Sequence, residues 1–206
     1  MGAASAPARV FSAIIECMGS LRSLQIDAAT GLLIGVRQVL SPHCDELPSG
    51  AAIDLIVIHG ISLPPGEFGG PWIDRLFTGC LPAGAHPYFA AIVGSRVSAH
   101  LLIRRTAEIV QYVPFERRAW HAGPSQYLGR SSCNDFSIGI ELEGTDETPY
   151  TGAQYAALAA LITALLGAYP TLSGQAIVGH SDVAPGRKTD PGPAFDWPRL
   201  RALLGG

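Results

Sequence analysis

The stretch AAIDLIVIHG, residues 51–60, is the most informative part of the sequence. Residues 51–58 form a run of strand length that is rich in β-branched residues, and His59 and Gly60 follow at once. This pattern predicts an apolar strand that ends in a histidine. Two other predicted strands end in the same manner, residues 136–142 with Glu141 near the end and residues 175–178 shortly before His180. If the three strands are neighbours, their reactive side chains meet at one rim of a sheet.

The remaining pattern supplies further strands, helices and one long loop. Strands are predicted over residues 31–40, 97–103 and 108–113, the last two forming a hairpin. The segment 63–71 contains three prolines, which restrict the backbone, and is predicted to be an ordered surface loop.

A helix is predicted to begin after Thr151, which forms a capping box with Gln154. It is expected to end near Gly167 and to present one apolar face, made of Tyr155, Leu158, Ile162 and Leu165. Asp196 is predicted to cap a closing helix through Leu204. Strands interleaved with helices predict an α/β fold, a mixed central β-sheet flanked by helices.

Composition limits the protein to one globular domain, residues 24–206, after a leader of residues 1–23 that we expect to be poorly ordered. Of the 206 residues, 48% are hydrophobic and 15% are charged, and the net charge is −3. There is no basic run, so nucleic-acid binding is not expected, and no apolar stretch has the length of a membrane helix. An alternative is that the leader is a secretion signal, but Glu16 interrupts its apolar part after six residues.

Two histidines and a carboxylate are the donors of many catalytic zinc sites. His59 and His180 are joined here by Lys188 and Asp190, which lie in a loop that Pro185, Pro191 and Pro193 stiffen. By pattern alone, the ordinary alternatives stay open: surface histidines, a solvated glutamate and lysine, and an aspartate that initiates a turn.

Long segments resemble the cytoplasmic N-acetyl-anhydromuramyl-L-alanine amidases of cell-wall recycling, which share their fold with peptidoglycan-recognition proteins. The segments that carry the resemblance are residues 61–74, 109–115, 133–146 and 187–193. The resemblance implies Zn²⁺ as cofactor, catalytic roles for Glu141 and Lys188, and three zinc ligands, His59, His180 and Asp190. It departs at two positions, Gly60 and Ser132, where relatives have asparagine and arginine.

Four residues are predicted to contact the substrate. Trp120 and Tyr112 offer flat surfaces for a sugar ring, Arg96 offers a cation for a peptide carboxylate, and His121 lies beside Trp120 in a candidate groove. His100 is interpreted as a structural residue or as one that supports the site without contacting metal or substrate.

The resemblance implies a cytoplasmic zinc amidase that cuts the bond between the lactyl group of (1,6-anhydro-)N-acetylmuramic acid and L-alanine. Its expected partner is a small soluble muropeptide; no nucleic acid, membrane or obligate protein partner is expected. The alternatives are a muropeptide sensor without catalytic activity and an exported amidase that degrades the wall.

Overall fold

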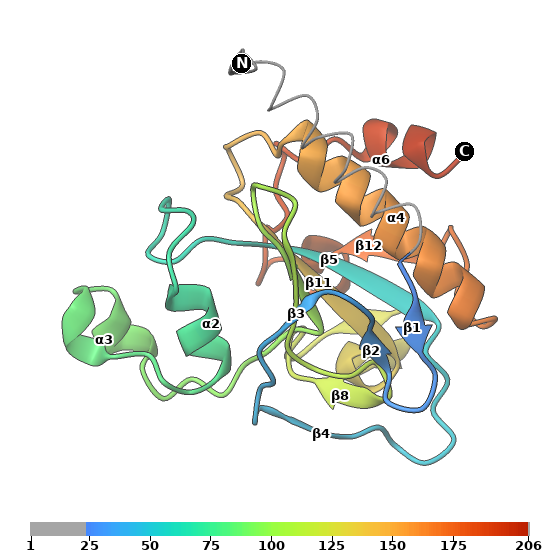
Figure 1. Cartoon of the computed structure of the whole chain (residues 1–206), viewed down its shortest axis with the longest axis horizontal. Coiled ribbons are helices and arrows are strands. Elements are labelled where there is room, and N and C mark those ends of the chain that lie inside the picture. Colours follow the sequence, from blue (N-terminus) through green and yellow to red (C-terminus); the bar gives the residue numbers. More distant parts are fainter. Residues whose placement is uncertain (1–23, 206) are drawn as a thin grey trace, which may run out of the picture.

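A six-stranded mixed sheet forms the centre of the molecule (Figure 1). The computed structural model describes residues 24–205, so the predicted leader lies outside the described residues. The order across the sheet is β12-β5-β11-β6-β7-β3. The bounds are β3 Arg37–Gln38, β5 Leu55–Ile61, β6 Leu101–Ile103, β7 Ile109–Gln111, β11 Ser137–Glu143 and β12 Ile177–Gly179.

The three predicted site strands are neighbours. β5 pairs in parallel with β12 on one side and β11 on the other. The hairpin of β6 and β7 is antiparallel, as predicted. The α/β fold class with a mixed sheet is confirmed.

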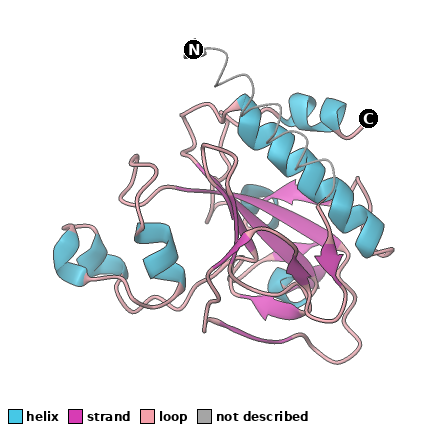
Figure 2. Cartoon of the chain, in the orientation of Figure 1, coloured by secondary structure: helices cyan, strands magenta, loops and turns pink. Residues whose placement is uncertain are grey.

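Helix α4, Gly152–Ala168, covers one face of the sheet, with α6, Trp197–Leu203, beside it (Figures 1 and 2). The predicted capping box is present: the Thr151 hydroxyl accepts from the Gln154 N–H, and the Gln154 side chain accepts from the Thr151 N–H. The predicted apolar face of α4 is buried against alternate residues of the strands, among them Ile56 and Ile58 of β5 and Ile138, Ile140 and Leu142 of β11. Asp196 caps α6 as predicted.

The opposite face of the sheet is covered by shorter elements. Helices α2, Trp72–Phe77, and α3, Phe89–Ile92, lie to one side (Figure 1), and α5, His180–Val183, follows β12 directly. Because strand side chains alternate between faces, the residues between those that meet α4, such as Leu55, Val57 and His59 on β5, point to this second face. The functional residues of β5 and β11 therefore lie on the side away from α4.

Several boundaries differ from the predictions. The predicted strand 31–40 is divided into β2, Leu32–Leu33, and β3, because a turn separates the two. β5 begins at Leu55 and continues past His59 to Ile61. The short helices α2 and α3 and the 3₁₀ turns η1 (Ala83–Ala85) and η2 (Cys133–Asp135) were not predicted. The segment 63–71 is the expected loop.

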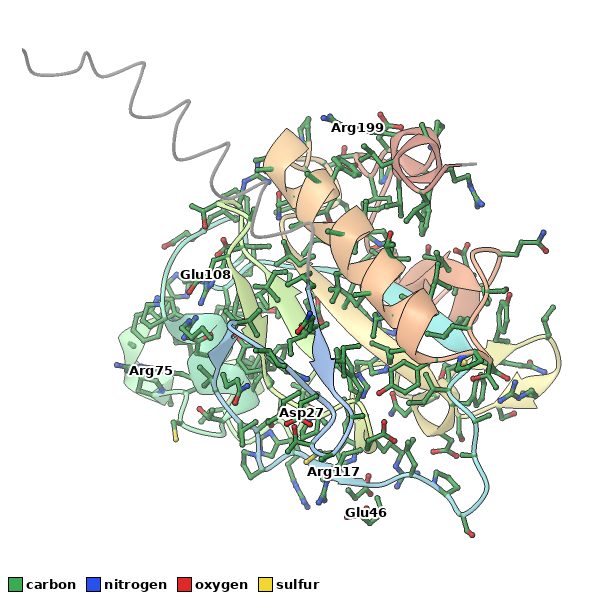
Figure 3. The ribbon with its side chains drawn as sticks, turned by 45° about the vertical axis from the view of Figure 1, so that its right-hand side comes forward. Asp27, Glu46, Arg75, Glu108, Arg117 and Arg199 are labelled. Atoms are coloured by element: carbon green, nitrogen blue, oxygen red, sulfur yellow. The ribbon has the colours of Figure 1, made fainter. Side chains whose placement is uncertain are left out.

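Small two-stranded sheets complete the periphery: β1 Ile26–Asp27 with β2, β4 Cys44–Glu46 with β8 Arg117–Ala119, and β9 Gln126–Tyr127 with β10 Arg130–Ser131. Charged side chains surround the molecule (Figure 3), such as Glu46 and Arg117, which form an exposed ion pair of 2.9 Å between β4 and β8. None of the described helices is long and apolar enough to cross a membrane.

Candidate metal centre and cleft

Strand register places the first two site residues side by side. Glu141 on β11 is the register partner of His59 on β5, and Gly179 on β12 is the partner of Ile58. The chain then turns into α5 at His180, so this imidazole stands next to that of His59. A backbone hydrogen bond from Ser181 N–H to the Asp190 carbonyl, 3.0 Å, folds the following loop back and brings Asp190 to the two histidines.

His59, His180 and Asp190 converge as a candidate metal site, and their roles as ligands stay a prediction. The two Nδ1 atoms are 2.9 Å apart, and Asp190 Oδ2 lies 3.2 Å from His59 Nδ1 and 3.1 Å from His180 Nδ1. Around a zinc ion about 2.0–2.1 Å from each donor, tetrahedral geometry separates neighbouring donors by roughly 3.3 Å. The triangle of donor atoms therefore fits one small ion.

The protonation states suit metal binding as well. Burial lowers the pKa of His59 to about 4, although the hydrogen bond with Asp190 opposes the shift. Burial would raise the pKa of Asp190, but hydrogen bonds with His180 and His59 outweigh it and hold the pKa below its usual range. His59 is thus neutral and Asp190 ionised at neutral pH, which are the forms that bind a metal.

Glu141 lies beside the three donor residues and is buried. It is 9% exposed, and its Oε2 has no hydrogen-bond partner among the described residues. Burial raises its pKa well above the ordinary value, the nearby Asp190 carboxylate adds to the rise, and Lys188 opposes it. A carboxyl group with a raised pKa is a stronger base than an ordinary one, which suits a group that accepts and then returns a proton.

A cleft of about 650 Å³ opens over these residues. His59, Glu141, His180, Lys188 and Asp190 all line it. Its other wall comes from the segment 61–98 and includes three residues for which the sequence predicted no role: Phe77 of α2, Tyr88 directly before α3, and Ile92 of α3. The spacing of Trp72, Ile73, Leu76 and Phe77 is helical and was the available signal for α2.

The four predicted substrate contacts divide into three kinds. Trp120 and His121 line the cleft. Arg96 is exposed near the rim, with its guanidinium carbon 4.9 Å from the centre of the Trp120 ring, and is not part of the lining. Tyr112 requires a correction, because it is fully buried in the core and its hydroxyl donates to Asp74. Its ring is covered by neighbours such as Phe77 and does not reach the cleft.

The two departures from the resemblance have different surroundings. A Cβ atom at Gly60 would lie 2.4 Å from the Tyr150 hydroxyl, so an asparagine there requires Tyr150 to move. That hydroxyl donates to the Pro191 carbonyl, 3.0 Å away, next to the predicted ligand Asp190. Ser132 is exposed and precedes η2.

A mixed α/β sheet with a His–His–Asp donor set and a buried glutamate over a cleft defines a class of hydrolytic enzyme. The sequence profile of the N-acetylmuramoyl-L-alanine amidase family matches residues 49–193. The chain belongs to this family of enzymes.

Curated relatives are similar over nearly their whole length. The 1,6-anhydro-N-acetylmuramyl-L-alanine amidase AmpD of Escherichia coli is 63% identical over 174 residues, which cover 84% of this chain and 94% of the relative. The AmpD of Haemophilus influenzae is 53% identical over 173 residues, with the same coverage.

Solved structures agree with the fold. A crystal structure of an AmpD derivative superposes with a TM-score of 0.85 at 60% identity and covers 88% of this chain and 99% of its own. The E. coli amidase AmiD, in complex with the substrate anhydro-N-acetylmuramic acid-L-Ala-D-γ-Glu-L-Lys, gives a TM-score of 0.55 at 29% identity, covering 77% of this chain and 60% of its own.

Proposed function

We propose that the protein is a zinc-dependent amidase that hydrolyses the bond between the lactyl group of 1,6-anhydro-N-acetylmuramic acid and L-alanine of the stem peptide. The observation that carries the proposal is the triangle of His59, His180 and Asp190 donors beside the unpartnered Glu141. The anhydro substrate is inferred from the 63% identity to an enzyme named for it. The reaction would serve peptidoglycan recycling in the cytoplasm.

Zinc held by this donor set would supply Lewis acidity toward water and the amide carbonyl. Glu141 takes the proton of the attacking water, because its carboxylate faces the cleft and its Oε2 has no competing hydrogen bond within residues 24–205. It then returns the proton to the alanine nitrogen as the C–N bond breaks, so that a neutral amine leaves.

Lys188 and the cleft walls complete the reaction. The Lys188 ammonium lines the cleft beside Glu141 and Asp190, where it can stabilise the negative charge that develops on the carbonyl oxygen. The indole of Trp120, fixed by donation from its Nε1 to Asp45 Oδ1 at 3.0 Å, offers an apolar surface for the sugar. Arg96 at the rim is suited to a carboxylate of the peptide.

A digest of a soluble anhydromuramyl peptide, followed by mass spectrometry, tests the proposal. We expect free stem peptide from the untreated protein, none after zinc is removed by a chelator, and recovery when zinc is restored. Asp190→Ala should bind no zinc and release no peptide. Binding of the muropeptide without cleavage would identify a sensor instead.

A second digest, on intact wall sacculi, separates recycling from wall degradation. A recycling enzyme should release peptide from soluble fragments far faster than from sacculi. Equal rates on both would favour an exported amidase.

A further inference from the structure

The two candidate histidine ligands share one outer support. Each directs Nδ1 toward the donor triangle and Nε2 away from it. His59 Nε2 lies 2.9 Å from His121 Nδ1, and His180 Nε2 lies 3.1 Å from the Ala122 carbonyl oxygen. Two consecutive residues, far from both ligands in sequence, therefore contact the outer nitrogen of both imidazoles.

Asn134 fixes this dipeptide in place. Its Oδ1 accepts from the His121 N–H at 3.2 Å and from the Ala122 N–H at 2.8 Å. Asn134 belongs to η2, which leads directly into β11, the strand that carries Glu141. One amide oxygen thus connects the support of both imidazoles to the strand of the candidate catalytic acid.

Ser137, which contacts the outer nitrogen of His121, indicates the direction of the hydrogen bonds between His121 and His59. Ser137 Oγ donates to the Cys133 carbonyl at 2.5 Å, so toward His121 Nε2, 3.3 Å away, it acts as an acceptor. His121 therefore carries its proton on Nε2 and accepts through Nδ1. This acceptor stabilises the His59 tautomer that carries its proton on Nε2, which is the form whose Nδ1 can bind a metal ion.

The carbonyl of Ala122 imposes the same tautomer on His180, because a carbonyl oxygen can only accept. The Arg187 guanidinium, 3.4 Å from His180 Nε2, also donates to this carbonyl, which has a second lone pair for it. The outer contacts therefore stabilise, in both imidazoles, the tautomer whose Nδ1 lone pair a metal ion requires.

The position of the His121 ring depends on a missing side chain. A Cβ atom at Gly139 on β11 would lie 2.4 Å from Cγ of His121. The ring therefore fits against His59 because position 139 is glycine.

We propose that His121 and Asn134 are positioning residues that fix the tautomer and orientation of both imidazoles and thereby set the affinity for zinc. This inference rests on the proposed zinc site. Outer partners of metal-binding histidines change metal affinity by about 10–100-fold when they are replaced.

The test is the zinc dissociation constant of the full chain, measured by competition with a chromogenic chelator. His121→Ala and Asn134→Ala should each weaken zinc binding by about 10–100-fold. His121→Asn should stay within a few-fold of the wild type, because the amide oxygen takes the place of Nδ1 as acceptor. Asn134→Asp should do so too, because its carboxylate accepts both N–H groups. The visible absorption of the cobalt-substituted protein should change in the two alanine variants and return in the conservative ones.

His100→Asn is the matched control. This buried ring is 5.8 Å from that of His121, but its nitrogens contact the backbone of Arg117 and Gly139 and neither ligand. It should lower thermal stability and leave zinc affinity within about twofold.

Three outcomes are informative. Wild-type zinc affinity in both alanine variants would overturn the inference, as would an equal loss in His100→Asn, because affinity would then only follow stability. If His121→Ala fails to fold, the zinc dissociation constants of Asn134→Ala and Asn134→Asp still test the inference. A wild-type protein that binds no zinc would instead refute the proposed function.

Discussion

Two glutamates on one strand show how differently this molecule treats a buried carboxylate. Glu141 and Glu143 are two residues apart on β11, so their side chains point to the same face of the sheet. Both are buried, at 9% and 2% exposure. Glu143 pairs with Arg104 at 3.1 Å and accepts from the Gly69 N–H at 2.6 Å, whereas Glu141 Oε2 has no partner among residues 24–205.

Glu143 belongs to a network of ion pairs and hydrogen bonds that also includes Arg104, Asp74 and Arg37. Arg104 also reaches Asp74 at 3.1 Å and the Gly70 carbonyl at 2.9 Å, and Arg37 pairs with Asp74 at 2.9 Å. A buried charge without partners costs free energy, so evolution normally satisfies it or removes it. The contrast indicates that Glu143 is structural, holding the 63–71 loop to the sheet, while Glu141 is kept for a ligand.

Glu141→Gln gives the largest expected effect and tests one side of this contrast. Loss of the proton-transferring group should reduce the rate of muropeptide cleavage by roughly 10²–10⁴-fold. Zinc content should be unchanged, and the free energy of unfolding should rise, because the variant removes a buried charge whose Oε2 has no partner among the described residues. Near-normal cleavage by this variant, or by Glu141→Ala, would remove the residue from the mechanism.

Glu143→Gln tests the other side. It leaves Arg104 with a weakened partner in a buried position, so the free energy of unfolding in urea should fall by about 3 kcal/mol. Cleavage by the folded protein should remain within a few-fold of the wild type. A large loss of rate with little loss of stability would contradict the division of roles.

Lys188→Met should lower the rate by roughly 10²–10³-fold, about 3–4 kcal/mol in the barrier, if the ammonium stabilises the developing oxyanion. Because Lys188 is exposed, the unfolding free energy should not change. Rates on the soluble muropeptide, together with a urea unfolding curve, provide the measurement. An unaffected rate would leave Lys188 as a solvated side chain of the loop.

Tyr112→Phe has the smallest expected effect. It tests whether this residue belongs to the core or contacts substrate in the cleft. It removes one hydrogen bond to Asp74, so the unfolding free energy should fall by about 1 kcal/mol. The KM for muropeptide should not change, since Tyr112 is buried away from the cleft. A raised KM would restore the original prediction that this ring contacts substrate.

The central strands and the long helix were predictable because they carry strong local signals. β5 and β11 are apolar runs, and α4 has both a capping box and an apolar face. The helices α2 and α3 are too short to be stable alone and depend on tertiary packing, which the sequence pattern does not display.

The candidate site, too, could be predicted only in part from the sequence. The reactive residues at strand ends were visible in the sequence, and the structure brings His59, His180 and Asp190 together; their roles as ligands stay a prediction. Tyr112 was misplaced because a strand pattern does not tell which face is core. The support of His180 is a backbone carbonyl, and a carbonyl has no signature in the sequence.

His59 and His180 are separated by 121 positions along the chain, so if both hold a metal ion, the fold must form before the site does. The complete set of three donors forms only after β12 has paired with β5 at the edge of the sheet. Metal binding would then follow the assembly of this edge of the sheet. Selection among competing metals would thus fall to the finished protein, with no part for the unfolded polypeptide.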